Sequence, residues 1–401
     1  MPASSKRTLA ACCTTHTLHD GLADMSYVLL PMLAQSFNLS LAQVGLVRSA
    51  LRAAMALFQT PAGLLAERLG ARNLLAFGTA CAGLAYIALG QASGFVAVLL
   101  ALFCAGFGSA VQHPICSTLI SHAYPGDGRR AALGTYNFAG DVGKFAFGGT
   151  ISMLAVAGVP WQLPVTVFGS LAIAAALTLL IVLDAQIGRV HHQRADNKTA
   201  EPDRGWGIRH RSGFIALCAI EVIDNGVRTG FLTFIAFLMI AKNLPAGWAA
   251  LSVPLVLIGG MAGKLACGFL AERLGVVRTI VVTEVATGAG ILLVLALPDL
   301  AAYLLLPLIG VALNGTSSVL YATIGDLVEP AKLPRAFGLF YTLGSTCGLV
   351  APLLLGALGD SIGVADAMIV TALLAFLTLP ACLVLRPALH ALHDSSKLQV
   401  Q

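Results

Sequence analysis

The chain is a succession of apolar segments, each long enough to cross a lipid bilayer as a helix. A spanning helix needs roughly 20 apolar residues. Cutting the sequence at its polar turns leaves segments over residues 13–36, 42–65, 73–91, 95–121, 131–156, 161–184, 213–241, 248–270, 279–297, 301–325, 333–357 and 365–386. Because lipid offers no partners to backbone N–H and C=O groups, each segment is expected to be α-helical. The sequence predicts an all-α membrane protein with twelve transmembrane helices.

Composition supports lipid as the solvent and excludes several classes of protein. Charged residues make up only 11% of the 401 residues, against about 25% in soluble proteins. A chain with so few charges is neither a cytosolic enzyme, nor a disordered protein, nor a nucleic-acid binder. Neither a catalytic triad nor a phosphate-binding loop is found, so we expect no enzymatic activity and no cofactor. The expected partners are the bilayer, protons and a small-molecule substrate, with the chain acting as a monomer.

Charge along the chain predicts its division and its orientation. The one long hydrophilic stretch, residues 185–212, is interpreted as a cytoplasmic linker between two six-helix bundles, residues 1–184 and 213–401. Of the 24 lysines and arginines, 18 fall on one side of the predicted membrane and only Lys242 on the other. Positive loops face the cytoplasm. Both termini are therefore expected to be cytoplasmic, in a multi-pass protein of the cell inner (cytoplasmic) membrane.

The two halves repeat one another. The octapeptide Gly63–Gly70 recurs almost unchanged as Gly268–Gly275, at an offset of 205 residues. An offset of 204 residues pairs Asp20 with Asp224, Asp24 with Arg228, and Gly140 with Gly344. Parallel duplication of a six-helix unit is an architecture found among transporters.

These repeated motifs resemble those of the major facilitator superfamily. Its signature between the second and third helices, G-x-L-x-(D/E)-R-x-G-x-(R/K), is met by residues 63–72, and a second copy lies between Gly268 and Arg278. The resemblance implies two pseudo-symmetric bundles that alternate access to a central cavity lined by spans one, four, seven and ten. It also implies a gating role for the charged loops and their glycines: Gly63, Glu67, Arg68, Gly70, Arg72, Glu272, Arg273 and Arg278.

Two shorter patterns resemble one branch of that superfamily, the fosmidomycin-resistance exporters. These patterns are His16-x-x-x-Asp20 on the first span and His113-Pro114 on the fourth. The superfamily's antiporter motif on the fifth span is only partly met, because Lys144-Phe145 stands where Gly-Pro is expected. The departure puts a cation at the depth of the membrane and leaves the direction of transport open.

Ionisable residues inside the spans are candidates for proton coupling. A charge at bilayer depth costs about 2.5–3.5 kcal/mol, so it needs a partner, a wet cavity or a function. The candidates are His16, Asp20 and Asp24 on the first span and Glu221 and Asp224 on the seventh. His16 with Asp20 is a candidate proton relay, because histidine titrates near neutrality; a snorkelling His16 is the alternative. Asp24 and Arg228 are interpreted as a switchable pair, or alternatively as a permanent ion pair.

Basic and uncharged polar residues at similar depth are candidates for substrate binding. Arg228, Lys144 and Arg52 are expected to neutralise an anion. The remaining candidates are Asp141, Lys264, His113, Gln112 and Asn314. For each a structural alternative is open: Asp141 and Lys144 can neutralise each other, and Pro114 can simply bend its helix. Arg48 is placed nearer the outer interface.

We therefore expect a proton-coupled secondary transporter that exports a small organic anion or drug, such as a phosphonate, by alternating access. The first alternative is a proton symporter that imports a small metabolite. The second is a transition-metal carrier that uses Cys12, Cys13 and His16, whose spacing places soft ligands along one stretch of helix. A non-transporting sensor on the same fold is the rival from another class.

Overall fold

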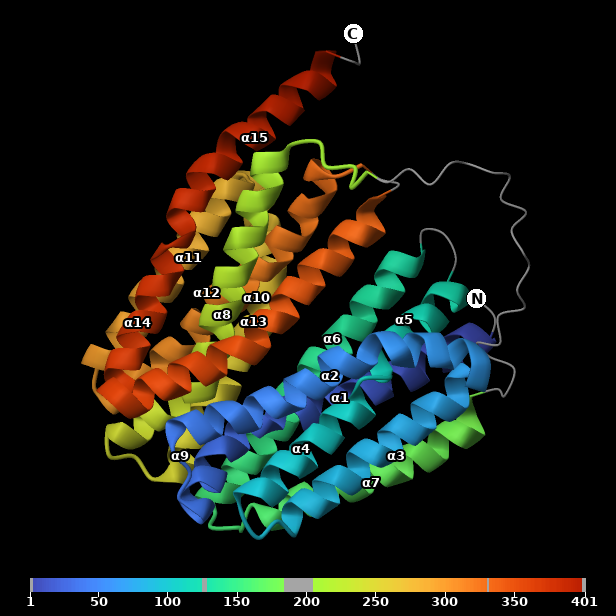
Figure 1. Cartoon of the computed structure of the whole chain (residues 1–401), viewed down its shortest axis with the longest axis vertical. Helices are drawn as coiled ribbons and strands as arrows, with labels where there is room; N and C mark the ends of the chain where they lie inside the picture. The colour runs from blue at the N-terminus through green and yellow to red at the C-terminus, as the bar shows by residue number, and fades with distance from the viewer. Residues whose placement is uncertain (1–2, 125–127, 184–204, 330–331, 399–401) are drawn as a thin grey trace. The chain divides into compact units, whose positions relative to one another are not determined.

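The computed structural model describes residues 3–124, 128–183, 205–329 and 332–398, and these residues are almost entirely α-helical (Figure 1). One isolated antiparallel bridge joins Ile208 to Val328. The helices are α1 (Ala3–Phe37), α2 (Leu41–Leu69), α3 (Ala71–Gly90), α4 (Phe95–Ser109), α5 (Gln112–Ala123), α6 (Gly128–Val156), α7 (Gln162–Val182), α8 (Arg211–Ala241), α9 (Ala246–Ala250), α10 (Ser252–Leu274), α11 (Val276–Ala296), α12 (Asp299–Leu327), α13 (Leu333–Ile362), α14 (Val364–Phe376) and α15 (Thr378–Leu398). Most of the predicted linker, residues 185–204, lies outside the described residues.

The twelve predicted spans correspond to these helices, nine as single helices and three as broken pairs: α4 with α5, α9 with α10, and α14 with α15. In each broken pair a proline is the third residue of the second helix, namely Pro114, Pro254 and Pro380. Proline is tolerated in the first turn of a helix because its missing N–H would have no intrahelical partner there. The bend predicted at Pro114 is therefore confirmed as a break between two helices.

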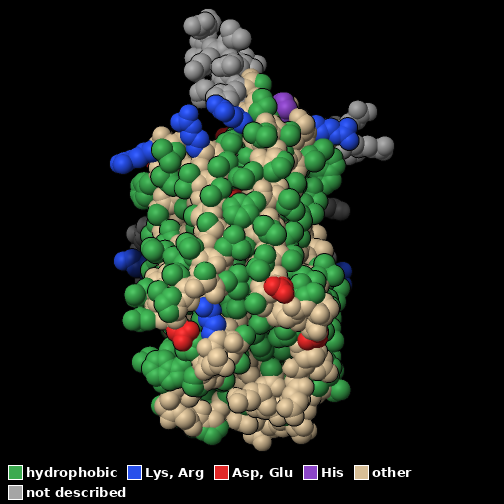
Figure 2. All heavy atoms as spheres, turned by 90° about the vertical axis from the view of Figure 1, so that its left-hand side faces the viewer, with side chains coloured by type: hydrophobic (Ala, Val, Ile, Leu, Met, Phe, Trp, Pro, Cys, Tyr) green, Lys and Arg blue, Asp and Glu red, His purple; other side chains and the backbone are tan. Residues whose placement is uncertain are grey.

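Ten segments of the described chain are long and apolar enough to cross a membrane. The two predicted spans that fall short are α1 and α6, and these two helices carry the densest polar groups. Figure 2 shows hydrophobic side chains over most of one face, with several lysine and arginine side chains towards one end. Exposed leucines such as Leu300, Leu304 and Leu383 fit a surface solvated by lipid rather than water.

The described chain separates into two compact units. The N-terminal unit takes the described residues before position 196 together with Leu244–Pro254, and the C-terminal unit takes the others. In the N-terminal unit α1 packs along α6, and α3 packs along α7. In the C-terminal unit α8 is the central helix, packed against α12, α13, α14 and α15.

Glycine makes the approach of α1 to α6 possible. A Cβ atom at Gly143 of α6 would overlap the carbonyl oxygen of Thr17 on α1, and one at Gly21 would lie 2.7 Å from the ring of Phe147. Small residues of this kind allow membrane helices to pack closely. The contact brings the polar residues of α1 against those of α6 and so builds the site described below.

Candidate functional site

Asp20 is the centre of a buried acid–base cluster in the N-terminal unit. Its carboxylate lies 3.2 Å from His16 Nε2 on the same helix and 3.1 Å from Lys144 Nζ on α6. A third contact, 3.5 Å from His113 Nε2, comes from α5. His16 and Asp20 meet because residues four apart share a helix face. The structure thus brings together four of the residues singled out from the sequence.

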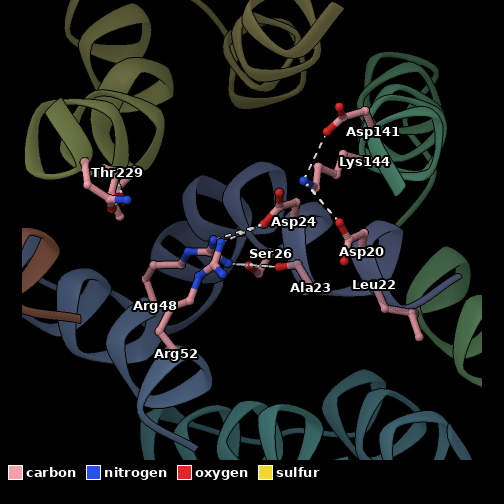
Figure 3. Close-up of polar contacts among 12 residues, drawn as sticks. Asp20, Leu22, Ala23, Asp24, Ser26, Arg48, Arg52, Asp141, Lys144 and Thr229 are labelled. Atoms are coloured by element: carbon pink, nitrogen blue, oxygen red, sulfur yellow. Dashed lines mark hydrogen bonds and ion pairs between the residues drawn. The ribbon is translucent and has the colours of Figure 1, made fainter. Parts of the chain in front are cut away.

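Lys144 joins two acids rather than one. Its Nζ atom lies 3.2 Å from Asp141 Oδ1, one turn away on α6, and 3.1 Å from Asp20 Oδ2 on α1 (Figure 3). The mutual neutralisation of Asp141 and Lys144 considered from the sequence is therefore present, but it is shared with Asp20. The lysine that replaces the glycine of the antiporter motif is tied to the proposed proton relay.

Asp24, one turn beyond Asp20, pairs with two arginines of α2. Its Oδ1 atom lies 3.1 Å from Arg48 Nη2 and 3.3 Å from Arg52 Nη2. Arg48 also donates to the hydroxyl of Ser26, and its guanidinium carbon lies 3.5 Å from the ring centroid of Tyr27. The expectation that Arg48 reaches the outer interface is wrong, because its side chain is fully buried within the protein. Sequence reasoning missed it because the partner that holds it inside is on another helix.

His16 is held so that its Nε2 atom faces the carboxylate of Asp20. Its ring stacks on Tyr136 at 4.0 Å, and its Nδ1 atom lies 2.7 Å from the carbonyl oxygen of Tyr136. A carbonyl only accepts, so Nδ1 must carry hydrogen. The other ring nitrogen, Nε2, lies 3.2 Å from Asp20 Oδ2. Gln112 supports the stack by donating to the hydroxyl of Tyr136 at 2.7 Å.

The C-terminal unit has its own acid cluster on α8. Glu221 is fully buried, and within the described chain neither carboxylate oxygen has a hydrogen-bond partner. Asp224 on α8 and Glu284 on α11 are also buried, and within the described chain Asp224 Oδ2 and Glu284 Oε1 have no hydrogen-bond partner. With the amide of Asn225 turned to suit its neighbours, its oxygen accepts from Arg228 Nη2 at 2.7 Å. Sequence analysis missed Glu284, although an acid inside the predicted span 279–297 was the signal that could have found it.

The two units place repeat-related glycines at equivalent points. A Cβ atom at Gly140 of α6 would lie 2.6 Å from His16 Nε2 and 2.9 Å from Asp20 Oδ2. One at Gly344 of α13 would lie 2.8 Å from Glu221 Oε1. In each unit a glycine therefore makes room for the buried acid cluster. Asp24 and Arg228 belong to different units, and each is described within its own.

Two further residues predicted to bind substrate, Asn314 and Lys264, lie in the C-terminal unit. Asn314 on α12 is buried, and its amide nitrogen donates to the carbonyl oxygen of Gly310 at 3.4 Å. A Cβ atom at Gly260 of α10 would lie 2.5 Å from that nitrogen, so Asn314 lies in a close contact between two helices. Lys264 lies one turn further along α10.

The predicted gating residues lie around two helix junctions, from α2 to α3 and from α10 to α11. Gly70 and Gly275 end α2 and α10 with φ values of 87° and 86°, a backbone conformation that glycine adopts without strain. This explains why the repeated octapeptide ends in glycine. Arg72 donates to the carbonyl oxygen of Leu180 at 3.3 Å. Arg68, Glu272, Arg273 and Arg278 are exposed, Gly63 lies within α2, and the side chain of Glu67 is outside the described residues.

The ligand set proposed for a transition metal is not the set that the fold brings together. Cys12 is fully buried in a hydrophobic cluster, so its thiol does not form a ligand site with Cys13 and His16. Among the described residues, the group with converging ligand atoms is His16, Asp20 and His113, whose candidate atoms all lie within 4.8 Å of one another. A lysine ammonium already occupies the open side of that carboxylate at 3.1 Å. A fixed positive charge there opposes a metal cation.

Comparison with known proteins places this geometry in a family. The sequence profile of the Major Facilitator Superfamily matches residues 13–306 and residues 226–399. An uncharacterized MFS-type transporter of Bacillus subtilis, YfnC, is 25% identical over 378 residues, covering 92% of this chain and 90% of its own. A hexuronate transporter of the same organism is 22% identical over 362 residues, covering 83% of each chain.

A solved structure shares the fold over nearly the whole chain. A bacterial homolog of the human lysosomal transporter Spinster, in an inward-facing and unoccupied conformation, superimposes with a TM-score of 0.81. The alignment covers 98% of this chain and 99% of the other at 18% sequence identity. At that identity the likeness concerns the fold, in agreement with the two-bundle architecture predicted from the sequence.

Proposed function

The chain belongs to the Major Facilitator Superfamily, and from this premise we propose that it is a proton-coupled transporter of a small organic anion. Membership makes it a multi-pass secondary transporter rather than an enzyme, with no cofactor to bind. The proton coupling, the anionic substrate and the direction are the parts that we propose. The observation that carries them is the graded burial of the paired charges around α1.

In that cluster three of the basic groups are more accessible than the acids that hold them, whereas Arg48 and His16 are buried deeper than their acids. The side chains of Arg52, His113 and Lys144 are 35%, 35% and 25% exposed. The carboxyl side chains of Asp20 and Asp24 are 11% and 10% exposed. An anion that reaches these residues can therefore contact the three exposed cations more readily than the carboxylates. Breaking a buried ion pair is costly because it leaves a charge without a partner, so separation of such a pair requires a proton on the acid and an anion on the cation.

This arrangement links proton binding to anion binding. When Asp20 takes up a proton, Lys144 loses one of its two counter-charges and is released to bind an anion. When an anion binds Lys144, the carboxylate loses its cation and holds a proton more readily. Binding sites linked in this way favour each other's occupancy. Proton and anion then travel in the same direction, which is symport, inward when the outside is the more acidic side.

The name of one sequence relative supports the proposal of an anionic substrate. Hexuronate, the substrate named for one relative, is an anion. At 22% identity this supports a substrate class for this chain and nothing narrower.

Export of a phosphonate-like anion or drug by proton antiport is the second candidate. It is favoured by the patterns His16-x-x-x-Asp20 and His113-Pro114, which resemble the fosmidomycin-resistance branch, and whose residues meet at one carboxylate in the structure. Antiport requires proton and substrate to compete for the same groups. Competition arises if the carboxylate of Asp24 or Asp20 itself contacts a cationic part of the substrate.

Reconstitution in liposomes that contain a pH-sensitive dye distinguishes the two. Glucuronate, methylphosphonate and glucose are added outside in turn, without a pH gradient at the start. Symport predicts acidification of the interior with one of the two anions and no change with glucose. Alkalinisation would indicate antiport. An anion taken up with no pH change, in the wild type and in Asp24→Asn alike, would refute proton coupling.

We further propose that the protein works as a monomer in the cytoplasmic membrane with both termini inside the cell. The bias of Lys and Arg to one side of the predicted spans supports this orientation. Labelling of a cysteine introduced at Ser4 by an impermeant thiol reagent in intact cells would contradict it, whereas labelling only after lysis is expected.

A further inference from the structure

Asn225 of α8 connects Arg228, one turn further along the same helix, to the neighbouring helix α13. Its amide oxygen accepts a hydrogen bond from Arg228 Nη2 at 2.7 Å. Its amide nitrogen donates to the carbonyl oxygen of Gly344 on α13 at 3.1 Å and to the hydroxyl of Thr229 at 3.3 Å. Each end of the amide therefore has a partner of the right kind, because a guanidinium only donates and a carbonyl only accepts. Asn225 joins the side chain of Arg228 to the backbone of a second helix.

The glycine at position 344 makes the room that this contact needs. α8 packs against α13, and a Cβ atom at Gly344 would lie 3.0 Å from the amide of Asn225. Ordinary contacts between such atoms are about 3.5–4.0 Å. The missing side chain thus lets the amide of Asn225 reach the backbone of α13, which is a fixed support because it belongs to a long helix.

The internal repeat shows that the two units place their polar groups differently at this point. At the offset of 204 residues, Asn225 corresponds to Gly21 and Gly348 corresponds to Lys144. In the N-terminal unit the lysine of α6 is held by two carboxylates. In the C-terminal unit its position is a glycine, and a Cβ atom there would lie 3.7 Å from the amide of Asn225. The space that a longer side chain would need at Gly348 is therefore taken by Asn225.

An amide differs from a carboxylate in what it does to the cation that it holds. The two carboxylates around Lys144 neutralise its charge, whereas the amide oxygen of Asn225 fixes the direction of the guanidinium and adds no negative charge. Direction matters for arginine because its planar group binds carboxylates and phosphates through two parallel N–H bonds. A side chain that is already oriented also loses less conformational freedom when a ligand binds.

We propose that Asn225 is a positioning residue for anion binding, which holds the guanidinium of Arg228 in the orientation that receives a carboxylate or phosphonate group of the substrate. Asn225 acts through Arg228 and does not have to touch the anion itself. The inference deepens the anion transport proposed above and rests on it.

Transport kinetics in liposomes test this role. The probe is whichever of glucuronate and methylphosphonate the wild type takes up, followed by exchange of labelled for unlabelled anion at equal pH. Asn225→Ala should raise KM about tenfold, the loss that corresponds to one hydrogen bond to a charged group. The maximum rate should stay close to that of the wild type, because the contact is lost from the bound state and the transition state alike.

Asn225→Asp distinguishes positioning from packing. Aspartate has the shape of asparagine and keeps an oxygen for Arg228, but its negative charge would neutralise the guanidinium, so KM should rise at least as much as in Asn225→Ala. A side chain that only packs α8 against α13 would tolerate this change with its KM unaltered. Where Asn225→Ala does not fold, Asn225→Asp alone decides.

The matched control is Gly226→Ala, at the next residue of α8. Its Cβ atom would lie 3.9 Å from that of Ala351 on α13, which is an ordinary contact, so this variant should keep the wild-type KM. A wild-type KM in Asn225→Asp, or a lower maximum rate as the only change in both Asn225 variants, would refute the positioning role and leave the proposed function standing. A wild type that takes up neither anion would refute the proposed function, and with it this inference.

Discussion

Substituting Gly140 by alanine should disrupt the proton relay by steric overlap. The added methyl carbon would lie 2.6 Å from both Cε1 and Nε2 of His16 and 2.9 Å from Asp20 Oδ2. Ordinary contacts between such atoms are about 3.5–4.0 Å, so the overlap is roughly 1 Å. His16 cannot rotate away without giving up its stack on Tyr136 and its 2.7 Å contact with the Tyr136 carbonyl. Overpacking of this size costs about 1–3 kcal/mol.

The matched control is Gly134→Ala on the same helix, where an added Cβ meets nothing within 4 Å. Alanine in an exposed helical position favours the helix by about 0.5–1 kcal/mol over glycine, so Gly134→Ala should be neutral or slightly stabilising. Heating each purified variant with a thiol-reactive dye follows unfolding, because the free cysteines Cys12, Cys116, Cys267 and Cys382 are buried in the fold.

We expect Gly140→Ala to unfold at a lower temperature than Gly134→Ala and to lose proton-coupled transport, while Gly134→Ala retains it. Equal unfolding temperatures together with equal transport would show that α6 can move away from α1 at no cost. The close packing that is taken here to build the relay would then be refuted.

Three further outcomes follow from the same contacts. Arg48→Ala should destabilise the protein more than Arg52→Ala when both are unfolded in denaturant, because the Arg48 side chain is fully buried and breaking a buried pair costs about 3–5 kcal/mol. The Arg52 side chain is 35% exposed, so solvent screens its pair with Asp24 and the loss is smaller; the reverse order would contradict this difference in burial. Lys144→Gln should move the pH of half-maximal uptake upwards, because an acid that has lost its cation binds a proton more readily, and an unchanged pH profile would exclude this lysine from the coupling. Gly344→Ala should impair the C-terminal unit as Gly140→Ala impairs the N-terminal one, since its Cβ would lie 2.8 Å from Glu221 Oε1; purified Gly344→Ala as heat-stable as the wild type would show that this contact yields.

Much of the α1 cluster could be anticipated from the sequence because its signals are local. His16, Asp20 and Asp24 follow helical spacing, so one helix face had to carry all three. Asp141 and Lys144 are three residues apart and meet for the same reason. The bend at Pro114 also follows from local chemistry, because proline removes a backbone hydrogen bond wherever it stands.

What escaped sequence analysis depends on contacts between helices. Arg48 was placed near the interface because its depth was counted along the chain, whereas Asp24 and Ser26 of α1 and the ring of Tyr27 hold it inside. Glu284 is the one charged residue of the predicted span 279–297, but no motif marks it, and its burial depends on how other helices pack around α11. Helical periodicity predicts which residues share one face of a helix, but it does not predict which other helices pack against that face. Neither the burial of Arg48 nor that of Glu284 could be predicted from it.

The sequence by itself determined the class of protein, because the period and length of its apolar segments admit only helices in a bilayer, and the repeated octapeptide marks the two halves. The tertiary structure decided which charges neutralise each other. A buried charge is stable only beside a partner, and the partners of Asp20 and Asp24 come from other helices, Lys144 from α6 and Arg48 from α2. Glycine lets α6 approach α1 closely enough for the first of these pairs. Which charges form pairs depends on how close they lie in space, and the periodicity of a single segment does not predict this.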